Sequence, residues 1–128
     1  MQFLKKSAPF GVLLAVSILA GCQTSTQVGS NEVKLSSAEV RSTFIGREWR
    51  GGSGSFFHSK DGASRYTADK GWKVTGTHTL SDDGVLCTIN DANGRRPNVK
   101  TCYTFYRDGD KYRYFHDRSG KFWPAYIR

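Results

Sequence analysis

The sequence lacks an apolar run long enough to span a membrane. Its longest such run extends from Phe10 to Ala20 and is interrupted only by Gly11 and Ser17. Eleven residues at 1.5 Å rise cover about half of a hydrocarbon core of roughly 30 Å, so a permanent transmembrane helix is disfavoured. A short run of this kind close to the N-terminus is typical of a segment that directs export and is then removed.

The residues around this run have the features of a secretory signal. Lys5 and Lys6 supply a positive flank, and small residues precede a cleavage position. The run ends in Leu19-Ala20-Gly21-Cys22, which resembles the lipobox of bacterial lipoproteins, in which the cysteine thiol takes a diacylglyceryl group before cleavage. The resemblance implies a signal peptide over residues 1–21 and an acylated Cys22 that anchors the protein to a membrane. The alternative is a chance cysteine after an ordinary signal peptide.

Cysteine is scarce, and its count favours a disulfide. If Cys22 carries lipid, only Cys87 and Cys102 remain in a chain exported to an oxidising compartment, and we expect them to be bonded. The bond would close a loop of about 15 residues and stabilise the fold by roughly 3 kcal/mol in the chain-entropy model. No histidine lies at ligand spacing from either cysteine, so we expect no metal and no other cofactor.

Acidic residues are also few. Without the two lysines of the signal, 17 basic residues face 11 acidic ones, a net charge of +6. Such a surface favours anionic neighbours such as lipid headgroups, lipopolysaccharide or acidic polymers, and we expect no nucleic acid. Arg95 and Arg96, the only adjacent basic pair of the mature chain, are the candidate contact for an anionic envelope component. The alternative is a basic surface that only keeps the protein soluble.

Recognisable catalytic signatures are missing. The Gly51–Ser55 run has no following helix, so it fits neither a nucleophile elbow nor a phosphate loop and indicates a flexible loop or bulge. His58, His78 and His116 lie on different expected strands, without metal-ligand spacing. We therefore expect a protein that is not an enzyme.

Once the signal is removed, 107 residues remain, which suits one domain. Residues 22–34 contain almost nothing apolar, and we interpret them as the lipidated cysteine followed by a flexible tether with a span of about 20 Å. The domain itself is expected over residues 35–128.

This domain is expected to begin with one short helix. Ser36 and Glu39 form a capping box, in which the serine oxygen accepts from the backbone three residues on. Leu35 and Val40 are placed to make a hydrophobic staple, and Gly46 stands where the helix would end. The helix is predicted over Ser37 to Ile45.

After Gly46, short aromatic or β-branched runs alternate with turn dipeptides that contain glycine. The expected strands are Arg47–Gly51, Ser55–Ser59, Ser64–Thr67, Thr75–Leu80, Val85–Ile89, Val99–Arg107, Lys111–His116 and Lys121–Ile127. The expected hairpin turns are Asp61-Gly62, Asp83-Gly84, Asn93-Gly94, Asp108-Gly109 and Ser119-Gly120. The pattern predicts a mainly β protein, a small antiparallel meander closed into a barrel that hides its edges.

The interior of this barrel cannot be assigned from the pattern. Residues 99–106 and 111–116 alternate regularly, but aromatic side chains fall on both faces. The aromatic residues therefore allow either a packed core, the more common arrangement, or a lined pocket.

The arrangement resembles a family of small exported alphaproteobacterial proteins of unknown function. The resemblance spans Leu35 to about Gly120 and rests on Leu35-Ser36 with Glu39-Val40-Arg41, Phe57 with Asp61-Gly62, Gly76-Thr77, Asp83-Gly84-Val85-Leu86-Cys87, and Cys102-Tyr103. It departs at Gly76-Thr77-His78, where the family tends to have Trp, a role that Trp72 could fill. The resemblance implies a lipocalin-like or avidin-like barrel and no known activity.

Two function classes remain. The first is an envelope lipoprotein with a binding or structural role, at the outer membrane because Gln23 is not the retaining Asp of enteric bacteria. The second is an inhibitor or small-ligand-binding barrel. Ser53-Gly54-Ser55 with Lys70-Gly71 faintly resembles lysozyme inhibitors of the membrane-bound lipoprotein type, but a basic protein would repel basic lysozyme.

Overall fold

The computed structural model describes residues 31–128. The predicted signal peptide, Cys22 and most of the predicted tether lie outside the described residues. Within the described part, no helix is long and apolar enough to cross a membrane.

The helix forms where the capping box predicts it. In α1 (Ser37–Phe44), the Ser36 hydroxyl accepts a hydrogen bond from the Glu39 N–H at 3.2 Å, which satisfies a donor that the first helical turn leaves free. The helix ends one residue earlier than predicted, because Ile45 adopts extended backbone and forms a parallel bridge with His58. Gly46 follows with a φ of 81°, which favours glycine.

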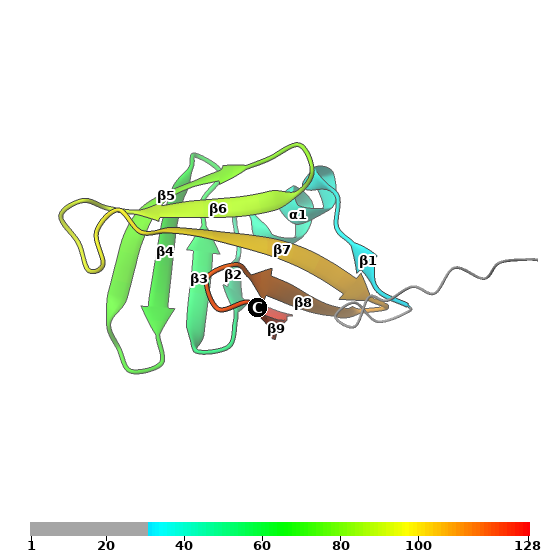
Figure 1. The fold of residues 1–128 in the computed structure, drawn as a ribbon. Helices are drawn as coiled ribbons and strands as arrows, with labels where there is room; N and C mark the ends of the chain where they lie inside the picture. The colour runs from blue at the N-terminus through cyan, green and yellow to red at the C-terminus, as the bar shows by residue number, and fades with distance from the viewer. Residues whose placement is uncertain (1–30) are drawn as a thin grey trace, which may run out of the picture.

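The described residues form nine strands. They are β1 (Val33–Lys34), β2 (Glu48–Arg50), β3 (Gly54–His58), β4 (Ala63–Ala68), β5 (Lys73–Leu80), β6 (Val85–Asn90), β7 (Lys100–Asp108), β8 (Lys111–His116) and β9 (Lys121–Ile127). From β2 onward each strand pairs with the next, and β9 returns to pair with β2. The result is a closed, eight-stranded, antiparallel up-and-down barrel, which confirms the predicted fold class (Figure 1).

Strand β1 corrects the predicted boundary of the tether, which placed Val33 and Lys34 in flexible chain. Both residues pair with the C-terminal half of β7, with Lys34 opposite Tyr106. Strand β7 extends beyond β6, whose pairing with it stops at Thr104, so the exposed edge takes β1 as its partner. The polar sequence of the segment gives no local signal for this long-range pairing.

Because strands alternate in direction, every second turn lies at the same end of the barrel. Residues 59–62, 81–84 and 109–110 lie at the end that α1 covers, and residues 51–53, 69–72, 91–99 and 117–120 lie at the other end, called the mouth here. Four expected turn glycines have positive φ: Gly62, Gly84, Gly109 and Gly120. Gly94 does not, contrary to the prediction. In that longer loop Arg96 (φ 50°) and Asn98 (φ 59°) adopt the left-handed conformation.

Helix α1 seals its end of the barrel with apolar side chains. Leu35, Val40 and Phe44 are at most 1% exposed. The Phe44 ring stacks on Phe105 at 4.1 Å between centroids and meets Trp49 edge-on at 5.4 Å. The staple pair Leu35 and Val40 thus belongs to one core that joins the helix to the strands.

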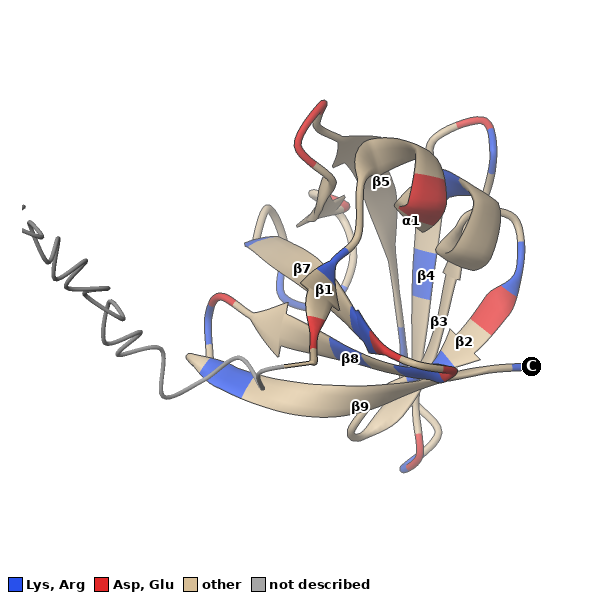
Figure 2. Cartoon of the chain, turned by 90° about the vertical axis from the view of Figure 1, so that its right-hand side faces the viewer, with Lys and Arg blue, Asp and Glu red and all other residues tan. Residues whose placement is uncertain are grey.

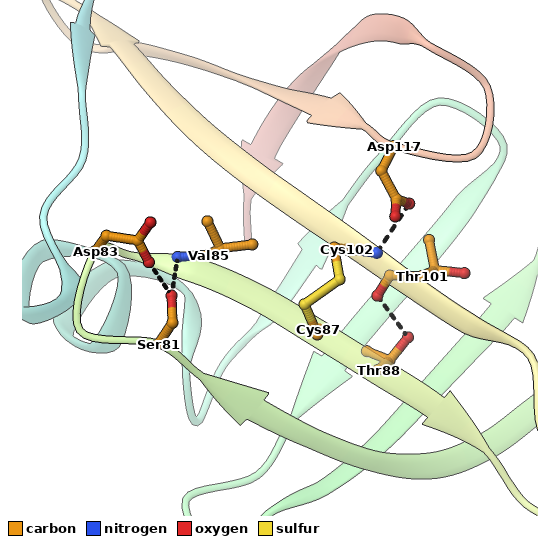
Figure 3. The surroundings of a disulfide bond; sticks show 8 residues. All are labelled: Ser81, Asp83, Val85, Cys87, Thr88, Thr101, Cys102 and Asp117. Carbon is orange, nitrogen blue, oxygen red and sulfur yellow. Dashed lines mark hydrogen bonds between the residues drawn. A yellow bond between two sulfur atoms is a disulfide. The ribbon is translucent and has the colours of Figure 1, made fainter.

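The disulfide joins Cys87 and Cys102, as predicted. The two cysteines face each other directly across β6 and β7, with Cα atoms 4.1 Å apart (Figure 3). Their neighbours Leu86 and Tyr103 are buried inside the barrel, so the cysteines lie on its outer surface. The bond therefore holds the two strands that carry the 91–99 loop of the mouth.

Candidate functional site

A cavity of about 450 Å³ occupies the mouth half of the barrel. Its lining includes residues from all four mouth turns, such as Ser53, Trp72, Arg96 and Ser119. This volume falls within the range of small-molecule sites, roughly 300–1,000 Å³. The interior therefore contains both arrangements that the aromatic pattern allowed, a packed core beneath α1 and a lined pocket, called the cup here, at the mouth.

The floor of the cup is aromatic. Trp49, which is fully buried, stacks on Phe56 at 4.2 Å between ring centroids. Phe56 in turn meets Tyr103 edge-on at 5.5 Å, and Tyr114 meets Tyr103 at 5.7 Å. Phe56, Tyr103 and Tyr114 all line the cavity, so its floor is the upper layer of the core. Their faces and edges offer flat apolar contacts.

His58 is the most deeply buried ionisable group of the floor, with 1% exposure. Its Nδ1 accepts a hydrogen bond from the Trp49 indole N–H at 3.3 Å. Burial, with a smaller contribution from His78, lowers the pKa of His58 to about 3. The imidazole is therefore neutral at physiological pH, and the bond to Trp49 assigns its proton to Nε2. His58 is therefore an uncharged residue among those that line the cup.

His116 has a related arrangement nearer the mouth. Its Nδ1 accepts a hydrogen bond from the Ser119 N–H at 3.0 Å, which leaves the proton of the neutral ring on Nε2. Burial lowers the pKa of His116. Both histidines line the cup, so the structure brings together two residues that lie far apart in the sequence.

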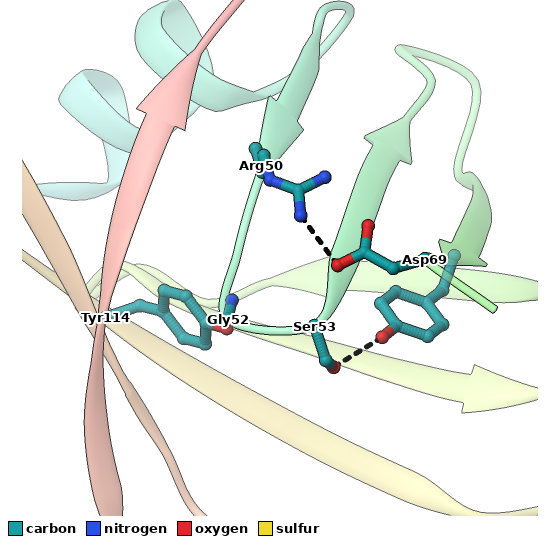
Figure 4. Close-up of polar contacts among 6 residues, drawn as sticks. Arg50, Gly52, Ser53, Asp69 and Tyr114 are labelled. Carbon is teal, nitrogen blue, oxygen red and sulfur yellow. Dashed lines mark hydrogen bonds and ion pairs between the residues drawn. The ribbon is translucent and has the colours of Figure 1, made fainter.

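Tyrosine hydroxyls tie the 51–53 turn to the wall of the cup. The Tyr114 hydroxyl accepts a hydrogen bond from the Gly52 N–H at 3.1 Å, and the Ser53 and Tyr66 hydroxyls lie 2.6 Å apart (Figure 4). Burial raises the pKa of Tyr103 and of Tyr114, so both phenols stay protonated.

Side chains pack closely around the glycines of the Gly51–Ser55 run, which the sequence suggested to be a flexible loop or bulge. A Cβ at Gly51 would lie 2.5 Å from the Tyr114 hydroxyl oxygen, and one at Gly52 would lie 2.7 Å from the Trp123 ring. The glycines are needed because the aromatic side chains of β8 and β9 approach the turn closely.

An ion pair fixes the neighbouring turn. The Arg50 guanidinium donates to the Asp69 carboxylate at 2.6 Å, and the Asp69 N–H donates to the Ser53 carbonyl at 3.0 Å (Figure 4). The guanidinium lowers the pKa of Asp69. Both side chains are exposed, so the pair positions the turns more than it stabilises the fold.

The arginine pair singled out from the sequence lies at the mouth. Arg95 and Arg96 are exposed in the 91–99 loop, and their guanidinium carbons lie 4.6 and 5.7 Å from the centre of the Trp72 ring. Arg96 also lines the cup, together with Arg118 from the turn between β8 and β9. Sequence reasoning missed Arg118 and the rim position of Trp72. Their positions could have been predicted from the sequence, because every second turn of a meander lies at the same end, which places the turns of Trp72, Arg96 and Arg118 together.

The described residues contain no group of three or more His, Cys, Asp or Glu side chains that could hold a metal ion. The rings of His58 and His78 lie 5.2 Å apart between centroids, but the Nδ1 of His58 is already occupied by Trp49. The cup offers a ligand aromatic surface and polar side chains.

Comparisons with models of known protein families, with curated proteins and with solved structures find no match to this chain.

Proposed function

We propose that this protein is a lipid-anchored protein of the bacterial envelope, bound to the outer membrane through Cys22, whose barrel binds a small molecule and catalyses no reaction. The observation that carries the binding function is the cup, a cavity of about 450 Å³ open at one end of an otherwise packed barrel. Interiors of small barrels are normally filled by side chains, so an unfilled half with aromatic walls favours a ligand site.

The position of the first described residues supports a cup that binds a ligand from solution. It does not favour direct contact between the mouth and the anchoring membrane. The first described residues lie at the α1 end, where Val33 pairs with Arg107 near the end of β7. The turns at this end contain several acidic residues, including Asp82, Asp83, Asp108 and Asp110. Figure 2 shows the molecule from this side. An anchor that precedes Glu32 therefore joins the domain opposite the mouth, which leaves the cup open to the surrounding solution.

The lysozyme-inhibitor alternative gains no support from the charges at the mouth. Ser53 and Lys70, the positions behind that resemblance, lie in two mouth turns. The same end carries Arg95, Arg96 and Arg118, all exposed. A strongly basic enzyme would be repelled from this surface during encounter.

The test uses the neutral fluorescent probe N-phenyl-1-naphthylamine with residues 22–128 carrying Cys22→Ser, because the apolar run Phe10–Ala20 of the signal would itself bind the probe. Val74 is 8% exposed and lines the cup, so Val74→Trp places an indole inside it. We expect this change to weaken probe binding about ten-fold, equivalent to about 1.4 kcal/mol.

Ile89→Trp provides the matched control, because Ile89 is 46% exposed on the outer face of the adjacent strand β6. This variant should bind the probe as the parent chain does. Thermal melts verify that both variants fold, and Thr101→Phe, at another buried position of the lining, replaces Val74→Trp if that chain does not fold. Equal binding by the filled and control variants would contradict the proposal, because the probe would then bind outside the cup.

A further inference from the structure

The charged side chains at the cup all have one sign. Its lining contains no Asp or Glu, whereas Arg96 and Arg118 line it at the mouth. A third arginine of the lining, Arg65, belongs to the outward face of β4, where its guanidinium lies over the Phe57 ring at 5.3 Å. A cationic ligand would meet two positive groups and no carboxylate within the lining.

The acidic residues closest to the mouth are engaged elsewhere. Asp69 pairs with Arg50, and Asp91 accepts a hydrogen bond from the Thr75 hydroxyl at 2.6 Å. Asp117 accepts one from the Cys102 N–H at 2.9 Å. These carboxylates hold the turns in place and form no ion pair with Arg96 or Arg118.

Arg96 and Arg118 are correspondingly free to bind an anion. The ion pairs between described residues use Lys34, Arg50, Arg107, Arg113 and Arg128. Neither Arg96 nor Arg118 forms an ion pair within residues 31–128. A guanidinium presents planar paired donors that match a carboxylate, sulfonate or phosphate.

Below the arginines, the cup changes from charged to apolar. Trp72 lies beneath Arg95 and Arg96 at the rim, and Phe56, Tyr103 and Tyr114 form the floor. The polar groups of the lining also include hydroxyls and the neutral imidazoles of His58 and His116.

Resting on the proposed function, we infer that the ligand is a small organic anion with a flat apolar body. Its anionic group binds Arg96 and Arg118 at the mouth, and its body lies against the aromatic floor. This order follows from the lining of the cup, where Arg96 and Arg118 lie at the rim and the rings of Phe56, Tyr103 and Tyr114 form the floor.

Two probes that share one skeleton test this inference. 8-Anilinonaphthalene-1-sulfonate is N-phenyl-1-naphthylamine with an added sulfonate, so a comparison of the two isolates the anionic group. With residues 22–128 carrying Cys22→Ser, we expect the sulfonate to bind about ten-fold more tightly, because the two guanidinium groups can form charge-assisted hydrogen bonds with it. Arg96→Gln with Arg118→Gln should remove this preference, because the affinity for the sulfonate should fall about ten-fold relative to the affinity for the neutral probe.

Arg41→Gln with Arg47→Gln is the matched control. Both residues are exposed, lie at the α1 end and form no ion pair within the described residues, so this pair changes the net charge equally but away from the mouth. It should retain the preference for the sulfonate. An equal loss in both double variants would overturn the inference, because the preference would then reflect overall charge.

The outcomes also separate this inference from the proposed function. If both probes bind in the cup with equal affinity, or if the mouth variant keeps its preference for the sulfonate, the inference is wrong and the ligand-binding barrel stands. If neither probe binds, or if Val74→Trp affects neither, the ligand-binding barrel itself is wrong.

Discussion

The stability of the barrel should depend on pH through His58. This side chain is 1% exposed, and its Nδ1 accepts the indole proton of the fully buried Trp49. Protonation would place a charge in the core beside His78 and would remove the acceptor that Trp49 uses. Burial accordingly lowers the pKa of His58 to about 3, from the ordinary 6.5 that applies to the unfolded chain.

The direction follows from which state binds the proton. Between these two pKa values the unfolded chain is protonated at His58 and the folded chain is not, so falling pH favours unfolding. The contribution of neutral His58 is complete above the unfolded pKa and is lost as the pH decreases towards about 3. From about pH 7 to about pH 5, the expected loss is about 2 kcal/mol in the free energy of unfolding.

Other groups can be separated from this effect. The lowered pKa values of Asp61, Asp69 and Asp83 act in the same direction, but mainly below about pH 4, where unfolded carboxyls take up protons. His116 also has a lowered pKa and is less deeply buried, so its contribution to this window is smaller.

The assay is urea unfolding followed by tryptophan fluorescence at both pH values, for the parent chain, His58→Asn and His116→Asn. Asparagine at position 58 retains an acceptor for Trp49 but does not titrate. We expect the parent chain and His116→Asn to lose about 2 kcal/mol, and His58→Asn to lose less than about 1 kcal/mol. The same loss in His58→Asn as in the parent chain would refute the assignment to His58.

Two further predictions concern the cysteines. Cys87→Ala with Cys102→Ala should lower the melting temperature by about 10–20 °C. The disulfide closes a loop in the unfolded chain and so stabilises the fold by about 3 kcal/mol. Calorimetry measures the change, and an unaltered melting temperature would contradict this role. Cys22→Ser should abolish incorporation of labelled fatty acid into the protein, whereas retained label in that variant would count against lipidation.

The strands could be predicted because their signals are local. Lys111–His116 and Lys121–Ile127 have the predicted bounds, and the other predicted strands shift by at most two residues at either end. Alternating side chains and turn glycines act over a few residues, as does the capping box at Ser36. The helix end shifted from Ile45 to Phe44 because a tertiary bridge to His58 took the last residue.

Features that depend on distant partners could not be predicted. Val33 and Lys34 form β1 only because β7 offers an uncovered edge. The 91–99 loop takes its positive φ values at Arg96 and Asn98, although Asn93-Gly94 is the stronger local turn signal. The conformation of this long loop depends on the strands that it joins and on its contacts with the Trp72 ring. Neither can be predicted from a few neighbouring residues.

By itself, the sequence determined the class of the fold, the approximate bounds of eight strands and the pairing of Cys87 with Cys102, whereas the order of the strands in the sheet came from the structure. The sequence also predicts export and lipidation at Cys22. Only the tertiary structure decided which face of each strand lies inside, because both faces of β7 and β8 carry aromatic rings. On the outer face, Tyr106 of β7 and Phe115 of β8 pack against Phe122 of β9. The tertiary structure also made the mouth half of the interior a cup with arginines at its rim, since that depends on how closed strands bring distant turns together.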